Sequence, residues 1–150
     1  MKKLLLAAAL AAGLSLSAAT PAVAQETVST PGSYMVVQGI FIEDGQFENY
    51  MDYIADRYRT QQEFAKQRGW ITGYRIFQNV NQRADEPDLY LLTEMPRMAT
   101  PQEQVERERA MSEAMRLTTR QSAEASGQRV KMRRLGSNVM LQELNLKPRR

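Results

Sequence analysis

Residues 68–95, RGWITGYRIFQNVNQRADEPDLYLLTEM, decide the fold that the sequence predicts. Two stretches rich in aliphatic, aromatic and β-branched side chains, 71–80 and 88–95, flank a polar segment, 81–87. This pattern is typical of two strands joined by a loop. We therefore predict a β-hairpin in the middle of the chain. Gly69, with Lys66 and Arg68 in the turn before it, predicts the end of the helix that precedes the hairpin.

A strand and a helix are predicted on each side of the hairpin. Upstream, YMVVQGIFI (34–42) is apolar on both faces, as in a central strand, and apolar steps of three and four residues from Phe47 predict a helix. Downstream, TPQE (100–103) combines a threonine N-cap, a proline at the first helical position and a capping-box glutamate. The last strand is predicted at 137–146.

This order, β–α–β–β–α–β, predicts an α+β domain with the ferredoxin-like plait. Right-handed crossovers then give a four-stranded antiparallel sheet with the helices on one face. Within the second helical region, Ser126-Gly127 predicts a break and Gly136 predicts the C-terminal stop. The domain is expected to span residues 34–147.

The first 24 residues have the pattern of a cleaved signal peptide. Two lysines precede an apolar run at 4–16, and Ala22-Val23-Ala24 is a signal-peptidase pattern that predicts cleavage before Gln25. The alternative is a membrane anchor, but this run is shorter than the roughly 20 residues that a span needs. The leader resembles bacterial ones, so we expect a periplasmic or secreted protein. A flexible leader (25–33) and a basic tail (148–150) are expected to flank the domain.

The composition excludes several chemistries. The chain has no histidine and no cysteine, which removes disulfides, thiolate nucleophiles, the serine–histidine–aspartate triad and the common zinc, copper and haem ligands. We expect no metal and no cofactor. Without the leader's lysines the chain carries 18 basic and 17 acidic residues, so no nucleic-acid partner is expected. The basic cluster (Arg129, Lys131, Arg133 and Arg134) is expected to be a solvated surface near a helix end.

The chain resembles the dimeric α+β-barrel superfamily, which includes antibiotic-biosynthesis monooxygenase-like and stress-responsive barrel proteins. The resemblance covers about residues 34–147 and rests on the element order, the doubly apolar first strand and RGWITGYRIF (68–77). It implies a homodimer whose sheets face each other, with a cavity in each barrel half. Active members commonly use histidine, so its absence argues against an enzyme.

Four polar residues form the candidate ligand site: Gln38, Arg75, Tyr90 and Glu94. Each lies among apolar residues on one face of its strand. With a symmetric hairpin loop, Arg75 lies opposite about Leu92 and diagonal to Glu94. The alternative is an Arg–Glu pair that is buried at a dimer interface or solvated on an open sheet. Trp70 is expected to plug the helix–sheet junction rather than to bind a ligand.

Three functions follow from these patterns. The first is a non-enzymatic domain that dimerises through its sheet and binds a small, partly apolar molecule. The second is a cofactor-independent oxygenase or isomerase in which Arg75 polarises the substrate and Glu94 acts as base. The third is a module that docks another protein at the cell envelope.

Overall fold

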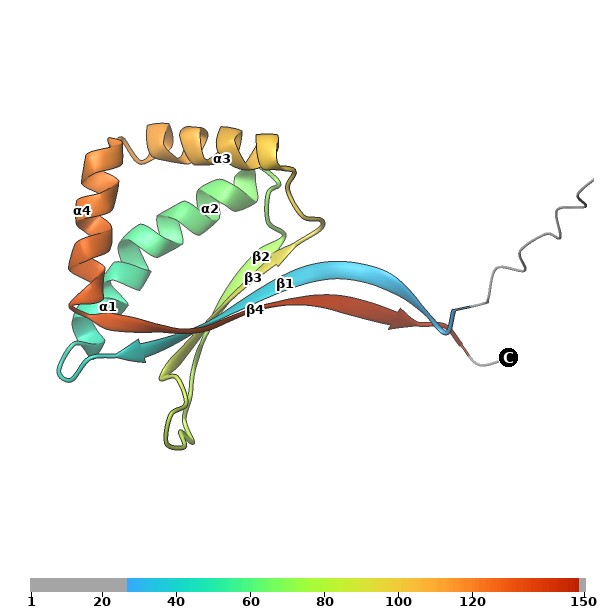
Figure 1. Cartoon of the computed structure of the whole chain (residues 1–150), viewed down its shortest axis with the longest axis horizontal. Coiled ribbons are helices and arrows are strands. Elements are labelled where there is room, and N and C mark those ends of the chain that lie inside the picture. Colours follow the sequence, from blue (N-terminus) through green and yellow to red (C-terminus); the bar gives the residue numbers. More distant parts are fainter. Residues whose placement is uncertain (1–26, 149–150) are drawn as a thin grey trace, which may run out of the picture.

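Between residues 27 and 148, which the computed structural model describes, four antiparallel strands form one sheet with the helices on one side (Figure 1). The predicted signal peptide lies outside the described residues. The elements in chain order are β1 (Ser29–Ile42), α1 (Phe47–Tyr53), η1 (Ile54–Tyr58), α2 (Arg59–Gln67), β2 (Gly73–Gln78), β3 (Leu89–Met95), α3 (Pro101–Ala114), α4 (Thr119–Val130) and β4 (Arg133–Leu146).

The sheet has the strand order β2-β3-β1-β4, with every neighbouring pair antiparallel. The predicted hairpin is confirmed as β2–β3. β1 starts earlier than predicted, because Ser29–Pro31 pairs with Leu144–Leu146 of β4. Residues 29–33 are therefore strand rather than flexible leader, since backbone pairing orders a segment of polar composition. This end of the β1–β4 pair extends beyond β3 as a two-stranded ribbon (Figure 1).

The helix predicted from Phe47 to the Gly69 region is confirmed, but it contains a π-helical turn, η1. The Arg59 amide donates to the Ile54 carbonyl, five residues back. The Thr60 hydroxyl donates to the Asp56 carbonyl at 2.7 Å, within the same turn. The helix ends as predicted at Gly69, whose φ of +68° is accessible to glycine without steric cost.

The second helical region breaks elsewhere than predicted. α3 ends at a Schellman motif: Arg116, at a φ of +52°, donates its amide to the Glu113 carbonyl, and Leu117 donates to Ser112. Thr118 then begins α4 with a second capping box. The predicted break at Ser126-Gly127 is wrong, because α4 runs through both residues.

The predicted stop at Gly136 is also wrong, because this residue lies inside β4. A side chain here would collide with Phe41 of β1, since an added Cβ would approach the ring to 2.8 Å. Gly136 therefore allows β4 to pack closely against Phe41 of β1, and it does not end a helix.

The core is small and lies between the first helix and the centre of the sheet. Its buried cluster consists of Ile40, Leu89 and Leu91 from β1 and β3, with Tyr50 and Ile54 from the first helix. Neither α3 nor α4 contains a buried residue. Most of the hydrophobic stabilisation therefore comes from one helix packed on two strands, and α3 and α4 add little to it.

Alkaline pH should destabilise the fold through Tyr50, whose ring is buried in this core. Burial raises the pKa of Tyr50 from 10.0 to about 12, although Arg133 and Arg129 act in the opposite direction. The unfolded chain loses this proton above pH 10 and the folded chain does not. We therefore expect about 2 kcal/mol of stability to be present below pH 10 and lost as the pH rises to 12.

Urea unfolding between pH 8 and pH 11.5 would measure this loss. Tyr50→Phe should flatten the alkaline part of the stability profile. An equally steep decline in this variant would assign the effect to other tyrosines, such as Tyr58, whose pKa burial also raises.

Candidate functional site

Three of the four predicted site residues lie on the open face of the sheet, away from the helices. Arg75 is paired with Leu92, as predicted from the hairpin, and Glu94 forms an ion pair with Arg75. Tyr90 shares their face, because side chains separated by two positions on a strand point the same way. The structure thus brings Arg75, Glu94 and Tyr90 onto one surface.

The ion pair between Arg75 and Glu94 is partly open to solvent. The arginine side chain is 57% exposed and the glutamate side chain 29%. An ion pair in this setting contributes at most about 1 kcal/mol. Apolar residues occupy the same face of the sheet, and Phe77, Val139 and Leu141 are 44–49% exposed. This open face is therefore an apolar surface that carries the Arg75–Glu94 ion pair.

Gln38 does not join this surface. It is paired with the buried Leu91 and so faces the helices. Its side-chain amide donates to the carbonyls of Gly39 at 2.9 Å and Ser137 at 3.1 Å. These contacts lie where the β1–β4 register shifts, between Gln38 and Ile40. The placement of Gln38 with the other three is wrong, because alternation defines two faces per strand but not which faces meet.

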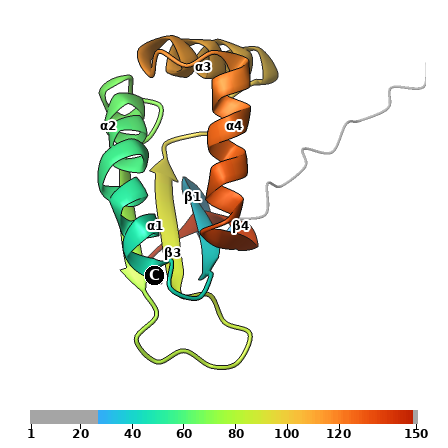
Figure 2. The same ribbon diagram turned by 90° about the vertical axis from the view of Figure 1, so that its left-hand side faces the viewer.

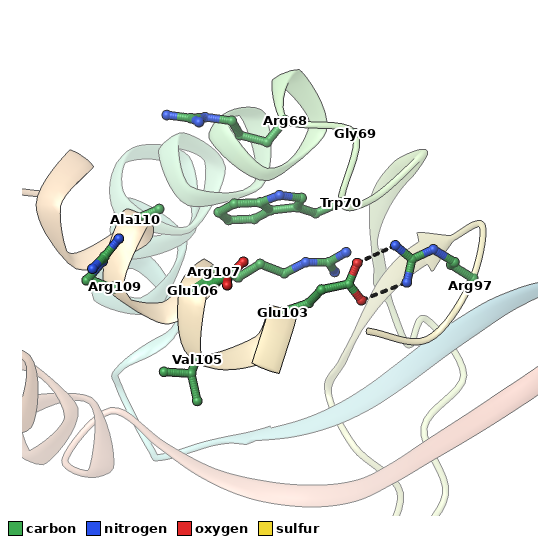
Figure 3. Close-up of a pocket in the computed structure, with 10 residues that line it drawn as sticks. All are labelled: Arg68, Gly69, Trp70, Arg97, Glu103, Val105, Glu106, Arg107, Arg109 and Ala110. Atoms are coloured by element: carbon green, nitrogen blue, oxygen red, sulfur yellow. Dashed lines mark hydrogen bonds and ion pairs between the residues drawn. The ribbon is translucent and has the colours of Figure 1, made fainter. Parts of the chain in front are cut away.

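A groove lies beside Trp70 on the helical side (Figure 3). It has a volume of about 620 Å³ and lies between the α2–β2 connection and α3. The lining residues are Arg68, Gly69, Trp70, Arg97, Glu103, Val105, Glu106, Arg107, Arg109 and Ala110. Two neighbouring hollows, of about 430 and 460 Å³, are also lined by both Trp70 and Arg107.

Trp70 is positioned by the end of the first helix. Its amide donates to the Ala65 carbonyl and that of Gly69 donates to Lys66, which completes a Schellman motif. The indole then packs edge-to-face on Phe64, with ring centroids 5.5 Å apart. One side of the ring therefore packs on the first helix, as the predicted junction role requires. The other side faces the groove, where the Arg107 guanidinium lies 5.5 Å from the ring centroid (Figure 3).

Two arginines of the groove are already paired with carboxylates: Arg97 with Glu103 and Arg109 with Glu113. Glu103 accepts hydrogen bonds from both terminal nitrogens of Arg97, one of them at 2.8 Å (Figure 3). These bonds, together with one from the Thr100 amide, lower the pKa of Glu103 to about 2. Among residues 27–148, Arg68 and Arg107 form no ion pair. Arg107 therefore offers its positive charge to an anionic ligand, beside the carboxylate of Glu106, which also lines the groove, while the Arg68 guanidinium lies over the Phe64 ring.

The hollow of about 430 Å³ supplies an apolar extension. Its lining is Trp70, Ile71, Met95, Met98, Ala99, Thr100, Pro101, Gln104, Arg107 and Met140. Methionine side chains adapt to ligands of different shape, since they are unbranched and polarisable. An apolar wall with a few polar groups at one end is the usual character of a small-molecule site.

Sequence reasoning did not predict this groove. α3 has charged residues around most of its circumference, so Arg107 resembles any solvated helix residue. The available signal was Trp70 next to a helix-ending glycine, which places an aromatic ring at a helix end. What the sequence could not show is that α3 crosses over this ring.

No protein-family model, curated protein or solved structure matches this chain. From residue 27 to residue 148, no helix is long and apolar enough to cross a membrane. In the same range, no three carboxylates come together in an arrangement that could hold a metal ion.

Proposed function

We propose that this chain is a periplasmic or secreted, non-enzymatic homodimer that binds a small, partly apolar anion in the groove beside Trp70. The observation that carries the proposal is the convergence of three hollows on Trp70 and Arg107. An aromatic ring supplies a flat apolar contact, and an arginine without a carboxylate partner supplies a charge for an oxyanion. The methionine-lined hollow would then receive the ligand's apolar part.

Ligand binding can be followed through Trp70, the only tryptophan in the chain. We expect anilinonaphthalene sulfonate, an aromatic anion, to quench Trp70 fluorescence by energy transfer. Arg107→Gln should weaken its binding about tenfold or more, because a charge-assisted contact is lost. Arg120→Gln, on the exposed surface of α4, is the matched control and should leave the affinity unchanged.

Arg75→Leu distinguishes this groove from the sheet site. If Arg75→Leu weakens binding and Arg107→Gln does not, the ligand occupies the open face and the groove assignment is wrong. Native mass spectrometry of the secreted protein adds two readings. A retained small molecule would name the natural ligand class, and the chain mass would show whether cleavage occurs before Gln25.

The fold component of the proposal is a ferredoxin-like plait. Its support is the strand order β2-β3-β1-β4 together with helices on a single side of the sheet. Read from the β4 edge, this order is 4-1-3-2, which is what two right-handed β–α–β crossovers interleaved in one antiparallel sheet produce.

The dimer component has separate support in the open face of the sheet. The residues along it that are apolar include Met35, Val37, Phe77, Leu92, Val139 and Leu141, which register places in neighbouring rows. A two-fold axis would set this surface against its own copy, apolar rows on apolar rows. The Arg75–Glu94 pair would then be buried between subunits. A second protein docked on the same face is the competing occupant, and the solution mass of the purified chain decides between the two.

A further inference from the structure

A second cavity lies at the other end of the helical layer, between the first helix and α4. Figure 2 shows these two helices at the two sides of the view, with β1 and β3 visible between them. The cavity has a volume of about 320 Å³ and is lined by Tyr53, Arg57, Gln61, Leu117, Ser122, Ala125, Gln128, Arg129 and Met132. None of these residues lines the hollows around Trp70. We propose that this cavity is a binding site for a small oxyanion.

The lining has the donor chemistry of an anion site. It contains two guanidinium groups, two carboxamides and two hydroxyl groups, and no lining residue is a carboxylate. Guanidinium groups match the planar fork of a carboxylate and the edges of sulfate or phosphate. A cation would meet two positively charged guanidinium groups and no negatively charged group of the lining. The charge of the lining therefore selects for anions.

Arg129 provides the strongest single observation. Its Nε is buried and has no hydrogen-bond partner, while its guanidinium lies 5.3 Å from the centre of the Tyr53 ring. Because Nε is closed off from the cavity, the terminal nitrogens of the Arg129 guanidinium are the donors that would reach a ligand. The stacked ring holds the guanidinium in place beside the cavity.

The basic cluster is thus not simply the solvated surface that its sequence predicts. Arg129 and Arg133 are half-buried, and each has a buried Nε. Their guanidinium groups lie against Tyr53 and Tyr50, respectively. Only Lys131 and Arg134 keep to the exposed surface. Tertiary packing turns two of the four positive charges toward the helical layer.

Arg57 approaches the cavity from the opposite side, and it belongs to the π-helical turn η1. A π turn contains one more residue than an α turn, so it changes which side chains the helix presents to its neighbour. Such turns recur at functional sites. Here the wider turn adds a second guanidinium to a cavity that already contains Arg129.

The size of the cavity limits the ligand. About 320 Å³ is at the lower end of the range for small-molecule sites. Leu117, Ala125 and Met132 form an apolar part of the wall, which suits a compact body attached to the anionic group. Inorganic phosphate, sulfate and benzoate therefore make a discriminating set of probes. They share the oxyanion and differ in geometry and in apolar surface.

Isothermal titration calorimetry on the secreted protein with these three probes tests the site. We expect saturable binding of at least one probe, weakened about tenfold or more by Arg57→Gln and by Arg129→Gln. Arg57 is exposed, so its replacement leaves the fold intact even if Arg129→Gln disturbs the packing on Tyr53.

Two matched controls give the test its specificity. Arg120→Gln removes a charge from the exposed surface of α4, and Arg107→Gln removes one from the Trp70 groove. Both should change the affinity by less than twofold. Absence of binding by all three probes would overturn the proposal. So would an equal loss of affinity in Arg57→Gln and Arg120→Gln, because binding would then follow net charge alone.

Discussion

Leu89→Ala should lower the melting temperature by roughly 10 °C. Leu89 is 1% exposed and lies in β3 between β1 and β2, where it belongs to the only buried cluster within residues 27–148. Truncation of a buried leucine costs about 3 kcal/mol, through lost apolar burial and the cavity that remains. The effect on the melting temperature is large because few other buried residues contribute to the hydrophobic stabilisation of the fold.

Leu144→Ala is the matched control for this prediction. It makes the same chemical change on β4, where Leu144 is 62% exposed, and should shift the stability by less than about 0.5 kcal/mol in the monomer. Urea unfolding monitored by circular dichroism measures both variants. If the two variants were equally unstable, the core would not lie between the first helix and β1–β3 in solution.

Leu141→Glu should convert the proposed dimer into monomers, with an increase of more than about a hundredfold in the dissociation constant. Leu141 is 49% exposed on the open face and is paired with Met35 of β1. A glutamate at this position places an unpaired carboxylate in the interface, and two-fold symmetry introduces it twice. The monomer should be unaffected, because the side chain already faces solvent there.

Sedimentation velocity over a range of protein concentrations measures this change. Val130→Glu is the control: it adds the same charge to an exposed apolar residue on α4, outside the sheet, and should leave the dimer intact. A wild-type chain that stays monomeric at about 100 μM would contradict the dimer, since an interface of standard size holds at that concentration. The open face would then belong to a different protein partner.

The structural features that depend on one short segment of sequence were predicted correctly. The capping box at Thr100–Glu103, the glycine end of the first helix and the β2–β3 hairpin all occur as predicted. The second capping box, at Thr118–Gln121, was equally present in the sequence. The pattern Ser126-Gly127 predicts a helix break instead. This predicted break lies about ten residues after the observed turn between α3 and α4.

The errors share one cause, which is that they depend on contacts between distant segments. Residues 29–33 form a strand because β4 pairs with them, and Gly136 is required because Phe41 lies against it. Gln38 faces the helices because β1 meets β3 in the register that places it beside Leu91. Neither the composition nor the periodicity of one segment contains this information.

The amino-acid sequence by itself determined the element order, the α+β class and the absence of histidine and thiol chemistry, because these follow from local patterns and composition. Only the tertiary structure decided where ligands can bind. Arg107 meets Trp70 because α3 crosses the helix end, and Arg129 meets Arg57 across a cavity because α4 stands beside the π turn. Binding sites arise from side chains brought together across the fold, and pairing and packing alone set those distances.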